Sequence, residues 1–284
     1  MQKKKQRRRS GPNHLRQSIS ATLTENWSGL AALHEPENAA ETLDTLFGGK
    51  LKLYQSRNGY RFSVDAVLLA YFASVGRAGK IADLGTGNAV IPLILAYLYP
   101  AASITGFELQ QGMLDRARRN ILLNGFAARV RIINGDVRSI EQSAQRGSFD
   151  AVTCNPPYRK SGGGRLSPDT EKKLARHELQ GTLDDFIRAG AYLLAAKGRM
   201  ALVYRAERTV ELFQTMQRFD IEPKSLRWVH SFVGAEASLI LVEGRKSSRS
   251  GLNILPPLVV YEKPKTYTAE LKRMLAGVRF QGPG

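Results

Sequence analysis

The feature that most constrains the fold is an apolar segment that runs into a glycine-rich turn and then into a second apolar segment. Residues 80–84 are short and apolar, Gly85 and Gly87 follow within a five-residue turn, and residues 90–99 suit a buried helix. Glycine permits a tight turn and lets a ligand approach the backbone. A strand, a glycine turn and a helix in this order begin a βαβ unit, which predicts an open α/β sheet.

Acidic residues recur at the carboxyl ends of the strands that the sequence predicts. Asp83 lies near the end of the first strand, Glu108 ends the second, and Asp136 follows the third. Each of them alone is compatible with an ordinary turn. Together they line the edge at which open α/β sheets bind ligands, so we expect Glu108 to accept ribose hydroxyls and Asp136, with Val137, to border an adenine.

NAD and S-adenosylmethionine both carry a ribose that such an acid can bind. The turn has the pattern Asp83-x-Gly85-x-Gly87-x-Ala89 and not the G-x-G-x-x-G of dinucleotide sites, and its acid precedes the glycines. A carboxylate there suits the positively charged aminocarboxypropyl sulfonium group better than a pyrophosphate. The turn therefore favours S-adenosylmethionine as the cofactor.

A second motif, Asn155-Pro156-Pro157-Tyr158, follows an apolar strand predicted over residues 149–154. The lone pair of an exocyclic amine such as adenine N6 is delocalised into the ring. An Asn oxygen and the carbonyl of Pro156, whose backbone the two prolines restrict, can accept both amine hydrogens and favour the nucleophilic form. Tyr158 can stack on the base. The alternative is a turn that simply ends a strand.

These motifs resemble those of the class I S-adenosylmethionine-dependent amino-methyltransferases. Residues 47–50 and 59–70 narrow the resemblance to the bacterial family that methylates N6 of adenine 37 in valine tRNA, and the similarity extends from about residue 43 to residue 242. The resemblance implies a doubly wound α/β fold with a mostly parallel, seven-stranded, Rossmann-like sheet and a C-terminal antiparallel hairpin. Two departures are Ala89, in place of a third glycine, and Ser56, in place of a proline.

The resemblance also assigns roles to individual residues. Arg61, Phe62 and Asp65 are expected over the methionine end of the cofactor. The cofactor-binding set is then Arg61, Phe62, Asp65, Asp83, Gly85, Gly87, Glu108, Asp136, Val137 and Asn155. The catalytic residues are Asn155, Pro156 and Tyr158, and those that contact the substrate are Pro157, Tyr158, Arg159, Lys160 and Arg165.

The charge of the chain indicates a polyanionic partner. Its 42 Lys and Arg outnumber its 25 Asp and Glu, which gives a net charge of +17. Residues 1–16 contain seven basic and no acidic residues, so the remainder still carries +10. RNA, most simply tRNA, is the expected partner, against the alternative of a solvated basic face without a partner.

Three parts of the chain are expected. Residues 1–40 form a basic, disordered tail or, alternatively, an organelle transit peptide. Residues 41–246 form the methyltransferase domain, in which residues 43–75 cover the cofactor, and residues 247–284 form an extension that packs on the domain or trails from it. The glycine-rich segment 159–167 is expected to be a mobile loop over the pocket or a linker.

Composition limits the remaining possibilities. A hydrophobic content of 43% is sufficient for a full core, and no apolar run approaches the roughly 18 residues of a membrane span. The single cysteine, Cys154, is expected to be a buried strand residue, and no Cys/His cluster suggests a metal. His177 is expected to have a positioning or structural role. We expect a soluble, cytoplasmic protein that is a monomer or weak dimer.

Several functions share these motifs. Methylation of adenine in tRNA is the first reading, and adenine in other RNA or in DNA is the second because the target atom is the same. Methylation of protein glutamine is the third. Enzymes of that class usually carry a helical recognition domain ahead of the cofactor-binding fold, and residues 1–45 are too short and too basic for one. A noncatalytic RNA-binding protein is the non-enzyme alternative.

Overall fold

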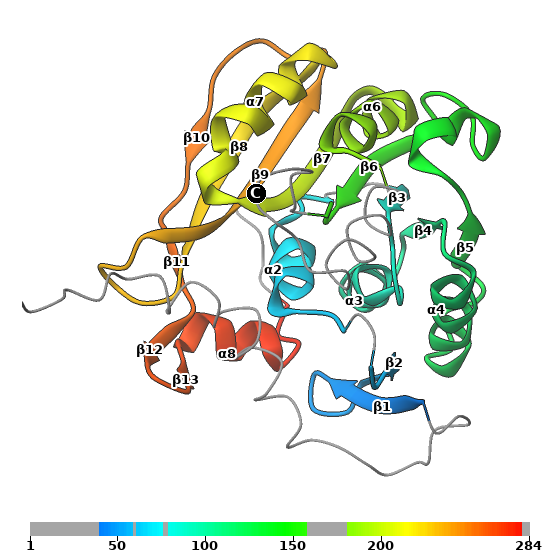
Figure 1. Cartoon of the computed structure of the whole chain (residues 1–284), viewed down its shortest axis with the longest axis vertical. Coiled ribbons are helices and arrows are strands. Elements are labelled where there is room, and N and C mark those ends of the chain that lie inside the picture. The colour runs from blue at the N-terminus through cyan, green and yellow to red at the C-terminus, as the bar shows by residue number, and fades with distance from the viewer. Residues whose placement is uncertain (1–39, 59–60, 76–78, 158–180, 280–284) are drawn as a thin grey trace, which may run out of the picture.

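The largest sheet determines the architecture of the computed structural model, which describes residues 40–58, 61–75, 79–157 and 181–279 (Figure 1). Its spatial order is β10-β8-β9-β7-β6-β3-β4-β5, and β11 also pairs with β8. Its strands are β3 (Lys80–Leu84), β4 (Ser103–Glu108), β5 (Val130–Asn134), β6 (Phe149–Cys154), β7 (Leu194–Arg205), β8 (Ile221–His230), β9 (Ala237–Lys246), β10 (Asn253–Ile254) and β11 (Leu258–Val259).

Five neighbouring strands, β5, β4, β3, β6 and β7, are parallel. β9 lies between β7 and β8 and is antiparallel to both. The predicted seven-stranded, mostly parallel sheet with a closing antiparallel hairpin is confirmed. β10 and β11 extend it beyond β8.

Helices cover both faces of the sheet, because residues of the strands alternate between two hydrophobic clusters. One cluster includes residues of α2, α3, α4 and α8, and the other includes residues of η3, α6 and α7. The helices are α2 (Val64–Phe72), α3 (Val90–Leu98), α4 (Gln111–Leu123), η3 (Val137–Gln142), α6 (Leu183–Leu193), η4 (Ala206–Arg208), α7 (Thr209–Arg218) and α8 (Ala269–Leu275).

Two peripheral segments complete the described part. An N-terminal hairpin of β1 (Glu41–Leu46) and β2 (Leu51–Ser56) lies against α4, and the C-terminal segment adds β12 (Tyr261–Lys263), β13 (Thr266–Tyr267) and α8. These segments meet where Gly277 packs on Phe47: a Cβ at Gly277 would lie only 2.7 Å from that ring. The ends of the described chain are thus joined on one face of the sheet (Figure 1).

The predicted elements agree closely with the observed ones around the two motifs, since β3 and β6 have the expected bounds. The apolar periodicity of residues 183–196 predicts a helix, and residues 199–204 predict a strand, but the helix α6 ends at Leu193. The chain becomes extended at Leu194, which pairs with Phe149, so β7 begins there and not at Arg199. Residues 1–39 and 158–180 lie outside the described residues, so the tail and the loop 159–167 stay predictions, as does the three-part division.

Candidate active site

The carboxyl edge of the sheet brings the two motifs together. Leu84 pairs with Phe107 on β4 and with Cys154 on β6. The residues that follow these three, Gly85, Glu108 and Asn155, are therefore at the same level of the carboxyl edge. Between β3 and β6 the order of the strands reverses, and ligands bind at such switch points. The glycine turn and the Asn-Pro-Pro turn flank this point.

The glycine turn requires its glycines. Gly85 and Gly87 have φ of +64° and +57°, in the left-handed region that glycine adopts without strain. Gly85 is exposed, and a Cβ there would lie 3.0 Å from Cε1 of Phe186. The turn therefore presents bare backbone to a ligand.

Ala89, the departure noted in the sequence, also has a left-handed backbone, with φ of +63°, at the N-cap of α3. A residue with a Cβ pays roughly 1–2 kcal/mol in this conformation. The side chain is fully buried. The position favours glycine, and the small Ala is accommodated at this cost.

Asp83 lies beneath the turn and is fully buried. Its carboxylate accepts hydrogen bonds from the hydroxyls of Thr86 (2.6 Å) and Thr153 (2.7 Å), which joins β3 to its turn and to β6. Burial raises the pKa of Asp83 to about 7, although both hydroxyls oppose the shift. The carboxyl is therefore poised to titrate near neutrality. Its contact with the cofactor stays a prediction.

Glu108 is fixed at the same edge. One carboxylate oxygen accepts from the backbone N–H of Gly87 at 2.9 Å, and the other accepts from that of Gln110 at 2.8 Å. Burial raises the pKa of Glu108, and these backbone donors oppose the rise. The carboxylate is thus held against the glycine turn in a single orientation, and an oxygen with two lone pairs can accept a further hydrogen bond.

Asp136 caps η3 and is held by its neighbour. Its carboxylate accepts from the backbone N–H of Arg138 at 2.8 Å and from the guanidinium of that residue at 2.6 Å. These hydrogen bonds lower the pKa of Asp136 despite partial burial. Val137 is buried beside it. The pair lies one strand beyond Glu108, where an adenine was expected.

The predicted cofactor cover begins at the hairpin. Arg61 donates to the Thr42 hydroxyl at 2.8 Å and pairs with Asp44. The backbone N–H of Phe62 donates to Gln55 of β2 at 2.9 Å, and Asp65 is buried in the first turn of α2. The structure thus ties this segment to β1 and β2, and its contact with a cofactor stays a prediction.

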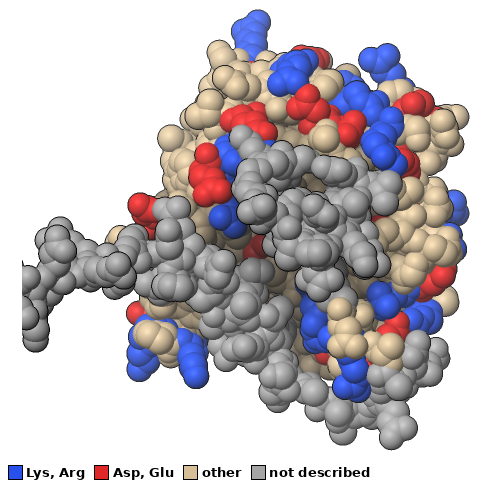
Figure 2. Space-filling model, in the orientation of Figure 1, with Lys and Arg blue, Asp and Glu red and all other residues tan. Residues whose placement is uncertain are grey.

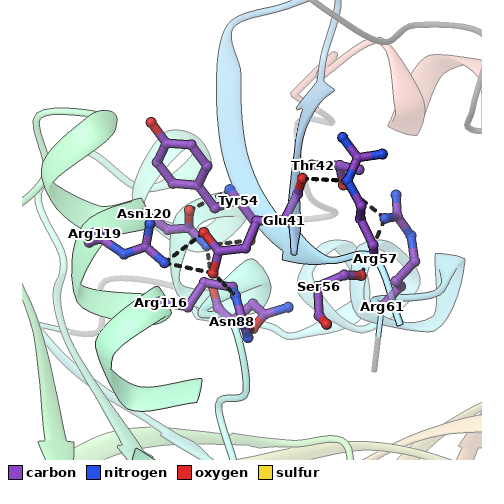
Figure 3. Close-up of polar contacts among 10 residues, drawn as sticks. All are labelled: Glu41, Thr42, Tyr54, Ser56, Arg57, Arg61, Asn88, Arg116, Arg119 and Asn120. Carbon is purple, nitrogen blue, oxygen red and sulfur yellow. Dashed lines mark hydrogen bonds and ion pairs between the residues drawn. The ribbon is translucent and has the colours of Figure 1, made fainter. Parts of the chain in front are cut away.

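An ion-pair cluster that the sequence analysis missed fastens this hairpin to α4 (Figure 3). Glu41, nearly fully buried, accepts from Arg116 at 2.8 Å and from Arg119 at 2.7 Å. Burial alone would raise the pKa of Glu41, but the two arginines outweigh it and lower the pKa. Arg116 also donates to the side-chain oxygen of Asn88, at 3.3 Å, next to Gly87.

Asn120 completes the cluster (Figure 3). Its side-chain oxygen accepts from the backbone N–H of Tyr54 at 2.6 Å, and its amide donates to the Asn88 carbonyl at 3.0 Å. The amide nitrogen of Asn88 is buried and has no hydrogen-bond partner among the described residues. The hairpin is therefore linked to the residue beside the glycine turn.

The Asn-Pro-Pro turn is only partly described. Asn155 and Pro157 are half-buried, and Pro156 is buried. Cys154, before the turn, is buried in β6 as expected, and burial raises the pKa of its thiol. Tyr158, Arg159, Lys160, Arg165 and His177 lie outside the described residues.

This arrangement fits an adenosyl cofactor. Three features lie together at the carboxyl edge of the sheet. The turn at Gly85 offers exposed backbone, the fixed carboxylate of Glu108 can accept from ribose hydroxyls, and the buried amide of Asn88, which has no partner among the described residues, can donate. In the described part of the chain, no group of three His, Cys, Asp or Glu is placed to hold a metal ion. No helix in that part is long and apolar enough to cross a membrane. Fold and edge define a class I S-adenosylmethionine-dependent methyltransferase.

Comparisons with known proteins agree. The model of the methyltransferase small domain matches residues 63–220. A Porphyromonas gingivalis protein named tRNA1(Val) (adenine(37)-N6)-methyltransferase is 32% identical over 65% of this chain and 74% of its own length. A Histophilus somni protein of the same name is 28% identical over 78% of this chain and 90% of its own. The chain therefore belongs to the methyltransferase small domain family and to that of the bacterial tRNA1(Val) (adenine(37)-N6)-methyltransferases, as the resemblance implied.

Solved structures support the fold. The Agrobacterium tumefaciens protein Atu636, described as a predicted O-methyltransferase, superposes with a TM-score of 0.63 and 25% identity, covering 76% of this chain and 97% of its own. The Pyrococcus horikoshii protein PH0793, described as a putative transferase, has a TM-score of 0.52 and 13% identity, over 83% of this chain and 85% of its own. The cofactor of this family is S-adenosylmethionine.

Proposed function

We propose that this enzyme transfers the methyl group of S-adenosylmethionine to N6 of adenine in tRNA, at position 37 of valine tRNA. The observation that carries the proposal is the position of Asn155. Cys154 pairs with Leu84, so the residues that follow them, Asn155 and Gly85, leave the sheet at the same level of its carboxyl edge. The amine-binding turn and the cofactor turn then border one crevice. The names of the relatives support the substrate.

The residues of the turn supply positioning and electrostatics. The side-chain oxygen of Asn155 and the carbonyl of Pro156 accept the two hydrogens of N6, and Tyr158 faces the adenine ring, with Pro157 shaping the turn. Bound S-adenosylmethionine supplies an electrophilic methyl group. The amine becomes acidic as it is methylated, so water suffices to remove the proton and no metal or covalent intermediate is needed.

The other proposed roles follow the edge of the sheet. Glu108 holds the ribose, and Asp136 and Val137 border the adenine of the cofactor. Asp83 attracts the positively charged amino group of the cofactor's methionine portion through space. Arg159, Lys160 and Arg165 contact substrate phosphates. The remaining residues proposed to bind the cofactor are Arg61, Phe62, Asp65, Gly85, Gly87 and Asn155. We propose that the enzyme works in the cytoplasm as a monomer or weak dimer.

The test is a methylation assay with labelled S-adenosylmethionine and total tRNA from a strain that lacks the gene. Digestion should release labelled N6-methyladenosine, and a valine tRNA transcript in which adenine 37 is replaced by guanine should accept no label. A different methylated nucleoside, or label on DNA or on protein glutamine alone, would overturn the assignment. If calorimetric titration detects no binding of S-adenosylmethionine, the chain is a noncatalytic RNA-binding protein.

A further inference from the structure

The N-terminal hairpin and the C-terminal segment meet at a pair of cations on one aromatic ring. Nζ of Lys50, in the β1–β2 turn, lies 5.9 Å from the centroid of the Tyr97 ring, and Cζ of Arg279 lies 5.6 Å from it. Arg279 also donates to the Tyr97 carbonyl at 2.6 Å. Both side chains are exposed. Two like charges therefore lie within 6 Å of the same ring at the surface.

Further exposed cations continue from this pair along α8 to the β12–β13 hairpin. Figure 2 shows Lys and Arg side chains protruding where Figure 1 places β12 and β13, and others near β1 and β2. We define the cationic strip by its exposed Lys and Arg residues, which are Lys50, Lys263, Lys265, Lys272, Arg273 and Arg279.

The strip is poorly neutralised. In the described part of the chain, Lys50, Lys263, Lys265, Lys272 and Arg279 have no carboxylate partner within ion-pair distance. Exposed Glu262 lies on the strip, whereas Glu270 is already paired with Arg227 at 2.7 Å. Among the described residues elsewhere, the exposed arginines Arg138, Arg199 and Arg218 do have carboxylate partners, whereas the ion pairs there include no lysine.

The strip starts at the edge that carries the site. Arg205, the last residue of β7, pairs with Leu239 near the start of β9, so the β8–β9 turn lies at the carboxyl edge. Phe232 of this turn packs on Tyr261 with ring centroids 5.5 Å apart, and Tyr261 stacks on Tyr267 at 5.1 Å. Lys263 and Lys265 belong to this β12–β13 hairpin, from which α8 extends for about 10 Å toward the Tyr97 pair.

We propose that the cationic strip binds the phosphate backbone of the RNA substrate and holds the body of that RNA along α8 while the target adenine enters the site. This rests on the proposed function. Exposed Lys and Arg in a row match a phosphate chain, and such contacts position a nucleic acid without reading its sequence. The strip residues themselves lie outside residues 63–220, the part of the chain that matches the domain model.

The test is the salt dependence of RNA binding by the full chain, with an in vitro transcribed valine tRNA as the probe. The double variant Lys50→Gln with Arg279→Gln removes two cations, which should reduce the slope of log affinity against log salt by about 1.4 to 1.8. Affinity at about 0.1 M salt should fall roughly 25-fold, because each phosphate contact contributes about fivefold there. The second strip variant, described next, lies outside the predicted cofactor-covering segment 43–75 and should keep the affinity of the wild type for S-adenosylmethionine.

A matched control removes one Lys and one Arg from another surface, with Lys80→Gln and Arg131→Gln, both exposed. The control should keep the slope of the wild type. A second variant, Lys263→Gln with Lys265→Gln and Lys272→Gln, alters only exposed side chains and should act like the first. If the strip and control variants lose affinity equally, or if the strip variants keep the slope of the wild type, the proposal is wrong. Loss of binding to phosphatidylserine vesicles with unchanged RNA binding would also overturn it.

Parallel methylation assays separate this proposal from the proposed function. RNA binding that depends on the strip, without methyl transfer by the wild type, would contradict the function and leave the strip in place. If both strip variants transfer methyl groups to the tRNA with unchanged KM and unchanged salt dependence, the strip proposal is contradicted and the proposed function is kept. We expect the variants to raise the KM for tRNA and to keep kcat at saturating tRNA.

Discussion

The two halves of the carboxyl edge differ in how far their side chains are buried. On the β3–β4 half, Asp83 and Glu108 are buried, and each carboxylate oxygen accepts a hydrogen bond within the protein. On the β6–β8 half, Asn155 is half-buried and the β8–β9 turn leaves Phe232 36% and Val233 86% exposed. The first half suits a small ligand of constant shape, and the second suits a large substrate that must enter and leave. This contrast makes preorganisation of the cofactor half the feature to test.

The largest effect should come from the turn on the open half. Asn155→Ala should lower kcat by about 10²–10³, the cost of removing one preorganised hydrogen-bonding group from a transition state. The affinity for S-adenosylmethionine should fall far less than kcat, because Asn155 is only one of the residues proposed to bind the cofactor and the others remain in place. Rates from single-turnover methylation measure the first quantity, and calorimetry measures the second.

Asn134→Ala is the matched control, because Asn134 is an exposed residue at the end of β5. It should keep full activity. Unchanged turnover of the Asn155 variant would remove the turn from the mechanism.

The next largest effect should come from the fixed half. Glu108→Gln retains the shape of the side chain, but its amide nitrogen then faces a backbone N–H of Gly87 or Gln110 and leaves it unpaired. Loss of the charged acceptor should weaken S-adenosylmethionine binding about 10- to 100-fold, with kcat at saturating cofactor little changed. Glu141→Gln, at an exposed residue of η3, is the control. A fall in kcat with normal cofactor affinity would contradict the ribose-binding role.

Asp83 should give opposite pH dependences for binding and stability. Its pKa of about 7 means that most molecules are protonated at pH 6, so the affinity for the cationic cofactor should fall about tenfold from pH 8 to pH 6. Because the pKa in the folded state lies above the ordinary value of 3.8, the contribution of Asp83 to stability is fully present below about pH 4 and is lost as pH rises through 7.

Asp83→Asn should flatten both profiles, and calorimetric titration with denaturant unfolding at several pH values measures them. The two hydroxyls that donate to Asp83 can turn to accept from an Asn amide, so the variant should fold. If the wild type and the variant have the same pH profiles, Asp83 does not control cofactor binding.

The smallest effect concerns the backbone of the fixed half. Ala89→Gly should relieve left-handed strain and lose about as much through a more flexible unfolded chain, so stability should change by less than about 1 kcal/mol. Ala89→Val adds bulk at a fully buried position and should destabilise by about 1–3 kcal/mol or more. Urea unfolding distinguishes the two, and a tolerated Val would contradict the assigned geometry.

The sequence could predict the local elements of the site but not the long-range contacts that surround it. The strands beside Gly85 and Asn155 are short apolar runs bounded by Gly or Pro, and local pattern was sufficient to place them. The Glu41 pairs with Arg116 and Arg119 join residues 75 and 78 positions apart, and one sequence contains no signal for such a contact. The two glycines between Phe47 and Lys50 are a hairpin signal, but the hairpin of β1 and β2 that they join was not predicted. The meeting of Gly277 with Phe47 depends on tertiary packing alone.

If one crevice serves both turns, a crystal structure of the enzyme with S-adenosylhomocysteine should show both turns around the ligand. The ribose hydroxyls should lie within hydrogen-bond distance of Glu108, the ligand should lie against the backbone of Gly85, and its sulfur should face the side-chain oxygen of Asn155. Ligand density elsewhere, or in the crevice with the Asn155 turn directed away from the sulfur, would contradict a shared crevice.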